Sequence, residues 1–200
     1  MIDVLYEDNH LIIVNKKAGD IVQGDKTGDT TLSDEVKSYI KNKYNKPGKV
    51  FLGTIHRLDR PTSGAIIYAK TSKALSRMNE QFRNKEVEKT YWAIVDNYPP
   101  NNSGILENYL EKNQKQNKSY ISKKNNGKHA ILEYKILKKL DNFYLLEIKP
   151  KTGRHHQIRT QLSNIGCVIR GDLKYGYKRS NKDGSIDLFA YKIKFIHPTK

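Results

Sequence analysis

Residues 56–70 read HRLDRPTSGAIIYAK, which joins a turn-forming segment to a compact apolar run of strand length. The proline at position 61 disfavours a helical conformation for Arg60, the residue before it. Asp59 is therefore predicted to lie on a loop, between the guanidinium groups of Arg57 and Arg60. The run at 65–70 is predicted to form a buried strand directly after that loop.

Apolar stripes and capping residues predict three helices around this stretch. Residues 31–44 have Thr30 or Thr31 as N-cap, residues 71–84 have Thr71 or Ser72, and residues 155–166 end at Gly166, which suits a left-handed cap. Further strands are predicted at 4–8, 11–17, 89–95, 130–137, 143–149 and 186–198. The lysine-rich residues 105–126 fit either a linker or a hairpin, and we favour the hairpin. We expect one domain spanning residues 1–200.

The composition is strongly basic, with 37 Lys and Arg against 21 Asp and Glu, a net charge of +16. Such a charge attracts polyanions, so nucleic acid is the leading partner, although a merely solvated lysine-rich surface has the same composition. Cys167 is the only cysteine, which excludes an intramolecular disulfide and favours a reducing cytoplasm. The N-terminus lacks the basic region of a signal peptide and no apolar run is long enough to span a bilayer, so we expect a soluble protein.

Two basic clusters are candidate sites. Asp59 between its arginines is either a surface ion-pair cluster or a carboxylate kept ionised to act as base or nucleophile. The second cluster, GRHHQIR at 153–159, begins a predicted helix and is either an incidental polar turn or a phosphate site. A metal site at His155 and His156 is disfavoured, because neighbouring helical side chains point apart and no further ligands accompany them.

Tyr91 and Trp92 are neighbours in a predicted strand, so their side chains face opposite ways and only one of them can line a cleft. Both could equally be core residues, since aromatic side chains pack cores far more often than they stack on bases.

The order of motifs resembles the RluA-type family of RNA pseudouridine synthases over residues 3–198. The motifs are NKKAGDIVQ, HRLDRPTSG, KTYWAIV, GRHHQIRTQL, GDLKYG and a final strand ending in FIHP. The resemblance implies an α+β fold, with a largely antiparallel central mixed sheet flanked by helices. It also implies that a uridine within RNA is isomerised to pseudouridine without a cofactor or a metal.

The family resemblance assigns roles to four residues. Asp59 would be the catalytic carboxylate, which either adds to the ribose C1' or removes a 2' proton. Tyr91 would contact the uracil and help to move the C5 proton. Arg159 would pair with Asp59, and Arg57 would enter the RNA helix in place of the extruded base.

Further cations are predicted to contact RNA. They are Lys16, Arg60, Arg154 and His156. Two positions depart from the family pattern: Lys17 replaces a common proline and His155 a common threonine, and both bear on RNA fit rather than catalysis. Because the chain begins almost at the catalytic domain, we expect its own charge to provide backbone binding.

Other functions stay open from the residues. The chain could be an RNA-binding protein without turnover, or a ribonuclease using His56, His155 or His156 as acid and base. The substrate is expected to be ribosomal or transfer RNA. The absence of a coiled coil or a sticky apolar stripe favours a monomer.

Overall fold

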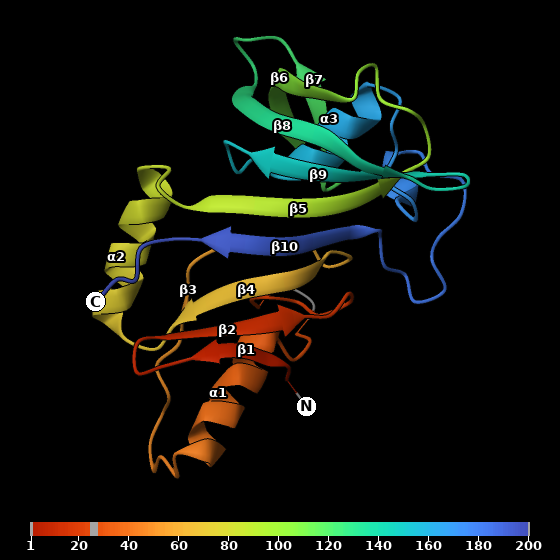
Figure 1. The fold of residues 1–200 in the computed structure, drawn as a ribbon. Helices are drawn as coiled ribbons and strands as arrows, with labels where there is room; N and C mark the ends of the chain where they lie inside the picture. The colour runs from red at the N-terminus through yellow and green to blue at the C-terminus, as the bar shows by residue number, and fades with distance from the viewer. Residues whose placement is uncertain (1, 25–27, 200) are drawn as a thin grey trace. The chain divides into compact units, whose positions relative to one another are not determined.

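The structure is a computed structural model that describes residues 2–24 and 28–199. By its internal contacts the chain divides into two compact units: unit 1 comprises Met1–Val87 and Ile193–Lys200, and unit 2 comprises Glu88–Lys192. The single domain expected over residues 1–200 stays a prediction. Figure 1 labels the ten strands and three helices formed by the described residues.

Unit 1 is built on antiparallel strands with one helix on each face. The strands are β1 (Val4–Glu7), β2 (Leu11–Lys16), β3 (Gly53–Thr54) and β4 (Ser63–Ala69), where β2 lies between β1 and β4 and β3 also pairs with β4. Alternate residues of β2 and β4 point to opposite faces. One face packs on α1 (Leu32–Lys43) and the other on α2 (Ser72–Arg83).

The helix ends follow the predicted capping residues. The Thr31 side chain accepts from the Asp34 backbone N–H in a capping box, and the Thr71 side chain accepts from Ala74 N–H. In the third helix, α3 (Gln157–Asn164), Gly166 follows the C-cap with φ +77°. Of the predicted alternatives, Thr31 rather than Thr30 and Thr71 rather than Ser72 is the N-cap, and the predicted helix end at Gly166 is confirmed.

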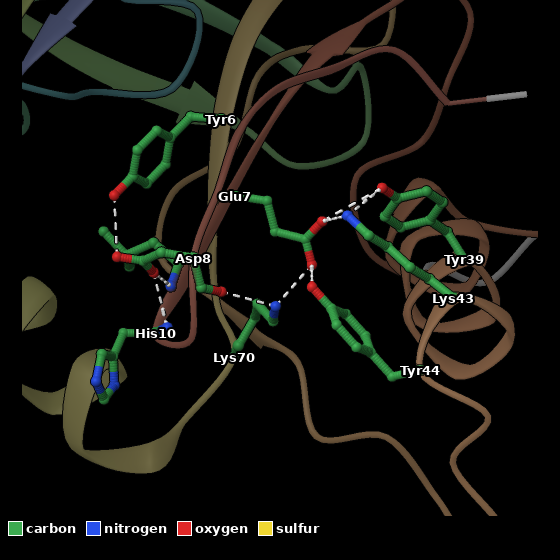
Figure 2. Close-up of polar contacts among 9 residues, drawn as sticks. Tyr6, Glu7, Asp8, His10, Tyr39, Lys43, Tyr44 and Lys70 are labelled. Carbon is green, nitrogen blue, oxygen red and sulfur yellow. Dashed lines mark hydrogen bonds and ion pairs between the residues drawn. The ribbon is translucent and has the colours of Figure 1, made fainter.

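A cluster around Glu7 ties β1 to α1 and to the end of β4. Glu7 Oε2 lies 2.7 Å from Lys43 Nζ, and Oε1 accepts from Lys70 Nζ at 2.6 Å and from the Tyr44 hydroxyl at 3.0 Å. Figure 2 shows these donors converging on the carboxylate. Burial raises the pKa of Glu7, but these hydrogen bonds outweigh it and hold the pKa at about 2.

Unit 2 is a larger antiparallel sheet with a helix on one face. Its strands are β5 (Glu88–Val95), β6 (Ser103–Asn113), β7 (Lys118–Ser122), β8 (Lys128–Lys139), β9 (Tyr144–Pro150) and most of β10 (Leu188–Lys194), in the order β10-β5-β9-β8-β6-β7. β6 and β7 form an antiparallel pair, which confirms the predicted hairpin. Ile158 and Leu162 of α3 pack into the core of the unit.

Candidate active site

The predicted site residues fall into both units. Lys16, Arg57, Asp59 and Arg60 belong to unit 1, and Tyr91, Arg154, His156 and Arg159 belong to unit 2. The predicted pairing of Asp59 with Arg159 joins residues of different units and therefore stays a prediction.

Asp59 lies on a loop, as predicted. This segment, residues 55–62, connects β3 to β4 and is called the Asp59 loop below. It closes in a turn in which Thr62 N–H donates to the Asp59 carbonyl at 3.0 Å. Asp59 is half-buried, whereas Arg57 and Arg60 are exposed. The loop therefore presents one partly desolvated carboxylate next to cations that solvent reaches.

The Lys16 side chain is hydrogen-bonded to the backbone of the Asp59 loop. Its ammonium group donates to the carbonyls of Lys17 (3.0 Å), Arg60 (3.0 Å) and Thr62 (2.7 Å). The side chain reaches them because Lys16 is the last residue of β2 and pairs with Gly64 at the start of β4. Its three N–H donors thus meet three carbonyl acceptors, those of Arg60 and Thr62 in the loop and that of Lys17 after β2.

Lys16 supports the loop from a buried position. The residue is 0% exposed, and its predicted contact with RNA stays a prediction. Burial lowers the pKa of Lys16 to about 8, while the charges of Asp20 and Asp59 raise it and that of Arg60 lowers it.

Arg60 and His56, two other residues of the Asp59 loop, each form a hydrogen bond with backbone outside the loop. Arg60 is exposed, but its Nε donates to the Gly19 carbonyl at 3.1 Å, and Gly19 N–H donates back to the Arg60 carbonyl at 2.8 Å. His56 Nε2 accepts from Ile67 N–H at 3.1 Å, and the His56 ring stacks on Phe82. A ring nitrogen that accepts a backbone hydrogen bond is not available as a general base.

Arg159 is held rigidly inside unit 2. Its Nε and one terminal nitrogen donate to the two carboxylate oxygens of Asp172 at 2.7 and 2.8 Å. The two side chains are only 5% and 1% exposed. A bidentate pair of this kind fixes the plane and direction of the guanidinium group as well as its position.

Tyr175 organises the surroundings of Arg159. Its ring lies 5.0 Å from the guanidinium carbon, and its hydroxyl accepts from Ser119 N–H at 2.9 Å and from the Thr160 hydroxyl at 3.1 Å. His156 Nδ1 lies 3.0 Å from the same hydroxyl oxygen. Together, Arg159, Asp172, Tyr175 and His156 are called the Arg159 network below.

His156 is a structural part of this network. It is the N-cap of α3 in a left-handed conformation, with φ 52° and no side-chain capping bond. Burial, followed by the charge of Arg159, lowers the pKa of His156 to about 2. The imidazole is therefore neutral and buried, and its predicted contact with RNA stays a prediction.

The remaining predicted residues of unit 2 differ in their surroundings. Tyr91 packs against the unit core, and Trp92 stacks on Tyr191, so the two neighbours face opposite ways as predicted. Arg154 is exposed and its Nε donates to the His129 carbonyl at 2.8 Å. His155, the departure from the family threonine, lies 2.8 Å from the Ser119 hydroxyl through Nδ1 and 3.1 Å from Asn117 Oδ1 through Nε2.

Two residues of the Arg159 network were not predicted. Asp172 and Tyr175 both lie in GDLKYG, a motif noted only for its place in the order of motifs. The available signal was an acidic residue and an aromatic residue downstream of a buried arginine. Their partnership depends on the turn that brings η1 (Leu173–Tyr175) back to α3, and local sequence does not specify this return.

No group of three or more His, Cys, Asp or Glu side chains within residues 2–24 and 28–199 is arranged to hold a metal ion. Over the same residues, no helix combines the length and apolar character needed to cross a membrane.

The described residues form an α+β protein with a half-buried carboxylate on a loop of unit 1 and a buried arginine on a short helix of unit 2. Residues 10–164 match the RNA pseudouridylate synthase family. The chain belongs to this family, as the RluA-type resemblance predicted.

Proteins similar to this chain are named as pseudouridine synthases. Ribosomal large subunit pseudouridine synthase D of Borreliella burgdorferi is 34% identical over 198 residues, which cover 96% of this chain and 60% of that protein. Ribosomal large subunit pseudouridine synthase C of Rickettsia felis is 38% identical over 177 residues, covering 88% and 56%. The chain thus spans about three fifths of the length of these relatives.

Solved structures confirm the fold. Human RNA pseudouridylate synthase domain containing 4 superposes with a TM-score of 0.81 at 24% identity, covering 96% of this chain and 84% of that one. Human RNA pseudouridylate synthase domain containing 1 gives 0.79 at 22% identity, covering 100% and 80%. The predicted α+β class with a mixed, largely antiparallel sheet is correct.

Proposed function

We propose that this chain isomerises uridine to pseudouridine in RNA and that its substrate is large-subunit ribosomal RNA. The observation that carries the proposal is the Asp59 loop, whose backbone is held by a buried lysine while its single carboxylate stays half-buried. The names of the relatives support the choice of ribosomal over transfer RNA.

The reaction needs no net transfer of atoms. The bond from C1' to N1 of the uracil breaks, the base turns over, and C5 bonds to C1'. The proton on C5 is lost and N1 gains one. In this proposal Asp59 supplies the carboxylate that either adds to C1' or removes a 2' proton, and Tyr91 assists the loss of the C5 proton.

Cations complete the proposed mechanism. Arg159 would act as the charge partner of Asp59, and its bidentate bond to Asp172 supports this role because it presents a pre-oriented guanidinium group. Arg57 is exposed and would occupy the space of the extruded base. Arg60 and Arg154 are exposed cations next to these groups and would contact phosphates.

The environments of two of the three candidate histidines argue against a ribonuclease. Nε2 of His56 is occupied as the acceptor of a backbone hydrogen bond, and His156 is neutral with a pKa of about 2. A neutral, buried His156 is not suited to donate a proton near neutral pH. No observation favours a non-catalytic RNA-binding role, because Asp59 and Arg159 are both intact and supported.

Asp59→Asn tests the proposal. The chain is incubated with an in vitro transcript of large-subunit ribosomal RNA, and pseudouridine is mapped by chemical labelling and primer extension. We expect product with the natural chain, none with Asp59→Asn, and similar RNA affinity for both, because the amide keeps the shape but removes the charge. Measurable turnover by the variant would refute the role of Asp59, and shortened RNA would instead indicate a nuclease.

A further inference from the structure

The segment between η1 and β10 is an ordered basic loop outside the motifs assigned above. Residues 177–185 read YKRSNKDGS and are called the basic loop below. Figure 1 shows the long connection that precedes β10, in which this loop lies. Lys178, Arg179 and Lys182 are all exposed.

Internal hydrogen bonds hold the basic loop in one conformation. Asn181 Nδ2 donates to Asp187 Oδ1 at 2.7 Å and to the Ser185 hydroxyl at 3.1 Å. The loop also folds back over Gly171, where an added Cβ would lie 2.7 Å from the Ser185 carbonyl oxygen and 2.9 Å from Asn181 Cγ. With φ +85°, Gly171 permits this close approach where a larger residue would not.

The carboxylates near the basic loop are occupied locally. Asp183 accepts from Ser185 N–H at 3.0 Å and from its hydroxyl at 2.6 Å, which lowers the pKa of Asp183. Asp187 accepts from Asn181 and lies 3.4 Å from an Arg170 nitrogen. Across residues 2–24 and 28–199, Lys178, Arg179 and Lys182 form no ion pair. Three positive charges within five residues therefore project from an ordered scaffold.

The basic loop begins at the Arg159 network. Tyr177 N–H, the first of the loop, donates to the Asp172 carbonyl at 3.0 Å, and Asp172 also holds Arg159. Both ends of the loop and the network belong to unit 2. Its cations thus follow Asp172 by six to ten residues, and Asp172 holds the buried Arg159, for which a catalytic role is proposed.

We infer that the basic loop is an RNA phosphate-binding element in which Lys178, Arg179 and Lys182 grip the backbone of the substrate. This inference rests on the proposed function and extends it by assigning a second contact surface. RNA phosphates suit the loop because lysine and arginine neutralise backbone charge without reading bases. A loop that is already ordered loses little conformational entropy when it binds.

Charge removal with a matched control tests the inference. One variant carries Lys178→Gln, Arg179→Gln and Lys182→Gln, and the control carries Lys41→Gln, Lys46→Gln and Lys49→Gln on exposed residues of unit 1. Both lose three positive charges. Binding to in vitro transcribed large-subunit ribosomal RNA is measured by filter binding across a salt series. A third variant, with Lys178→Arg, Arg179→Lys and Lys182→Arg, keeps the charge.

We expect the loop variant to bind roughly tenfold more weakly than the control at low salt. Its slope of log affinity against log salt should be about 2 units shallower, because each lost phosphate contact contributes somewhat less than one unit. The charge-preserving variant should bind like the natural chain. At saturating RNA the turnover rate of the loop variant should be unchanged, so the effect appears in KM and not in kcat.

Equal affinity and salt slope in the loop variant and the control would overturn the inference. So would an equal loss in the charge-preserving variant, because shape rather than charge would then be responsible. Failure of the natural chain to form pseudouridine would refute the proposed function instead, and the binding comparison would still decide the role of the basic loop.

Discussion

The Asp59 loop and the Arg159 network present opposite charges and are held in opposite ways. The loop is held through its backbone, with the Lys16 ammonium group donating to two loop carbonyls and to that of Lys17 while the Asp59 side chain stays half-buried. The network is held through side chains, with the Arg159 guanidinium group bound by both oxygens of Asp172. In the loop a buried cation positions an anion, and in the network a buried anion positions a cation.

This difference matters for how each region responds to mutation. Asp172 directly compensates a buried charge, so its loss should affect the stability of unit 2 strongly. Lys16 donates its hydrogen bonds only to neutral carbonyls and is itself costly to bury. Its loss should therefore disturb the geometry of the Asp59 loop more than the stability of unit 1.

The largest effect is expected for Asp172→Asn. The variant keeps the shape of the side chain but leaves the guanidinium group without this buried carboxylate, so the free energy of unfolding should fall by about 3 to 5 kcal/mol. Urea denaturation followed by circular dichroism measures the change. The control is Asp187→Asn, whose pair with the half-exposed Arg170 lies at 3.4 Å and should contribute at most about 1 kcal/mol. Equal losses in both variants would contradict the proposed asymmetry.

A smaller loss of stability, but a large loss of turnover, is expected for Lys16→Met. The free energy of unfolding should fall by roughly 2 kcal/mol, because carbonyls that lose their donor are partly offset by removal of a buried charge. Displacement of the Asp59 loop should lower kcat by about a hundredfold. RNA affinity and its salt dependence should be unchanged, and the exposed neighbour serves as the control in Lys17→Met. Loss of affinity with normal kcat would instead support the predicted RNA-binding role of Lys16.

Local patterns were sufficient to predict the elements that carry the site. Thr31, Thr71 and Gly166 mark helix ends through hydrogen bonds or backbone conformations that involve only nearby residues. Strand alternation likewise predicted that Tyr91 and Trp92 face opposite ways. Each of these features depends on periodicity or on contacts within a few positions, which a sequence displays directly.

The supports of the site could not be predicted in the same way. Within NKKAGD, Lys16 has the appearance of a surface lysine, and only the pairing of β2 with β4 buries it beneath the Asp59 loop. Asp172 likewise has no distinguishing signal in the sequence. Its role follows from the fold, which returns the chain to α3 and brings the Asp172 carboxylate to Arg159. Both roles arise from contacts between residues far apart in the chain, where burial converts ordinary charged residues into structural ones.

The smallest expected effect is a pH dependence of turnover. It arises at Lys16, which supports the Asp59 loop, and not in the Arg159 network. The folded pKa of Lys16 is about 8, below the unfolded value of about 10.4. Between these values the unfolded chain retains a proton that the folded chain has lost, so the contribution of Lys16 to stability rises with pH. Turnover should nevertheless decline above about pH 8, because the neutral amine has only two N–H donors for three carbonyls. We therefore measure kcat and thermal denaturation over the same pH range. We expect kcat to fall as the pH rises, whereas the contribution of Lys16 to stability does not fall. In Lys16→Met the inflection should disappear, and its persistence there would assign the titration to another group.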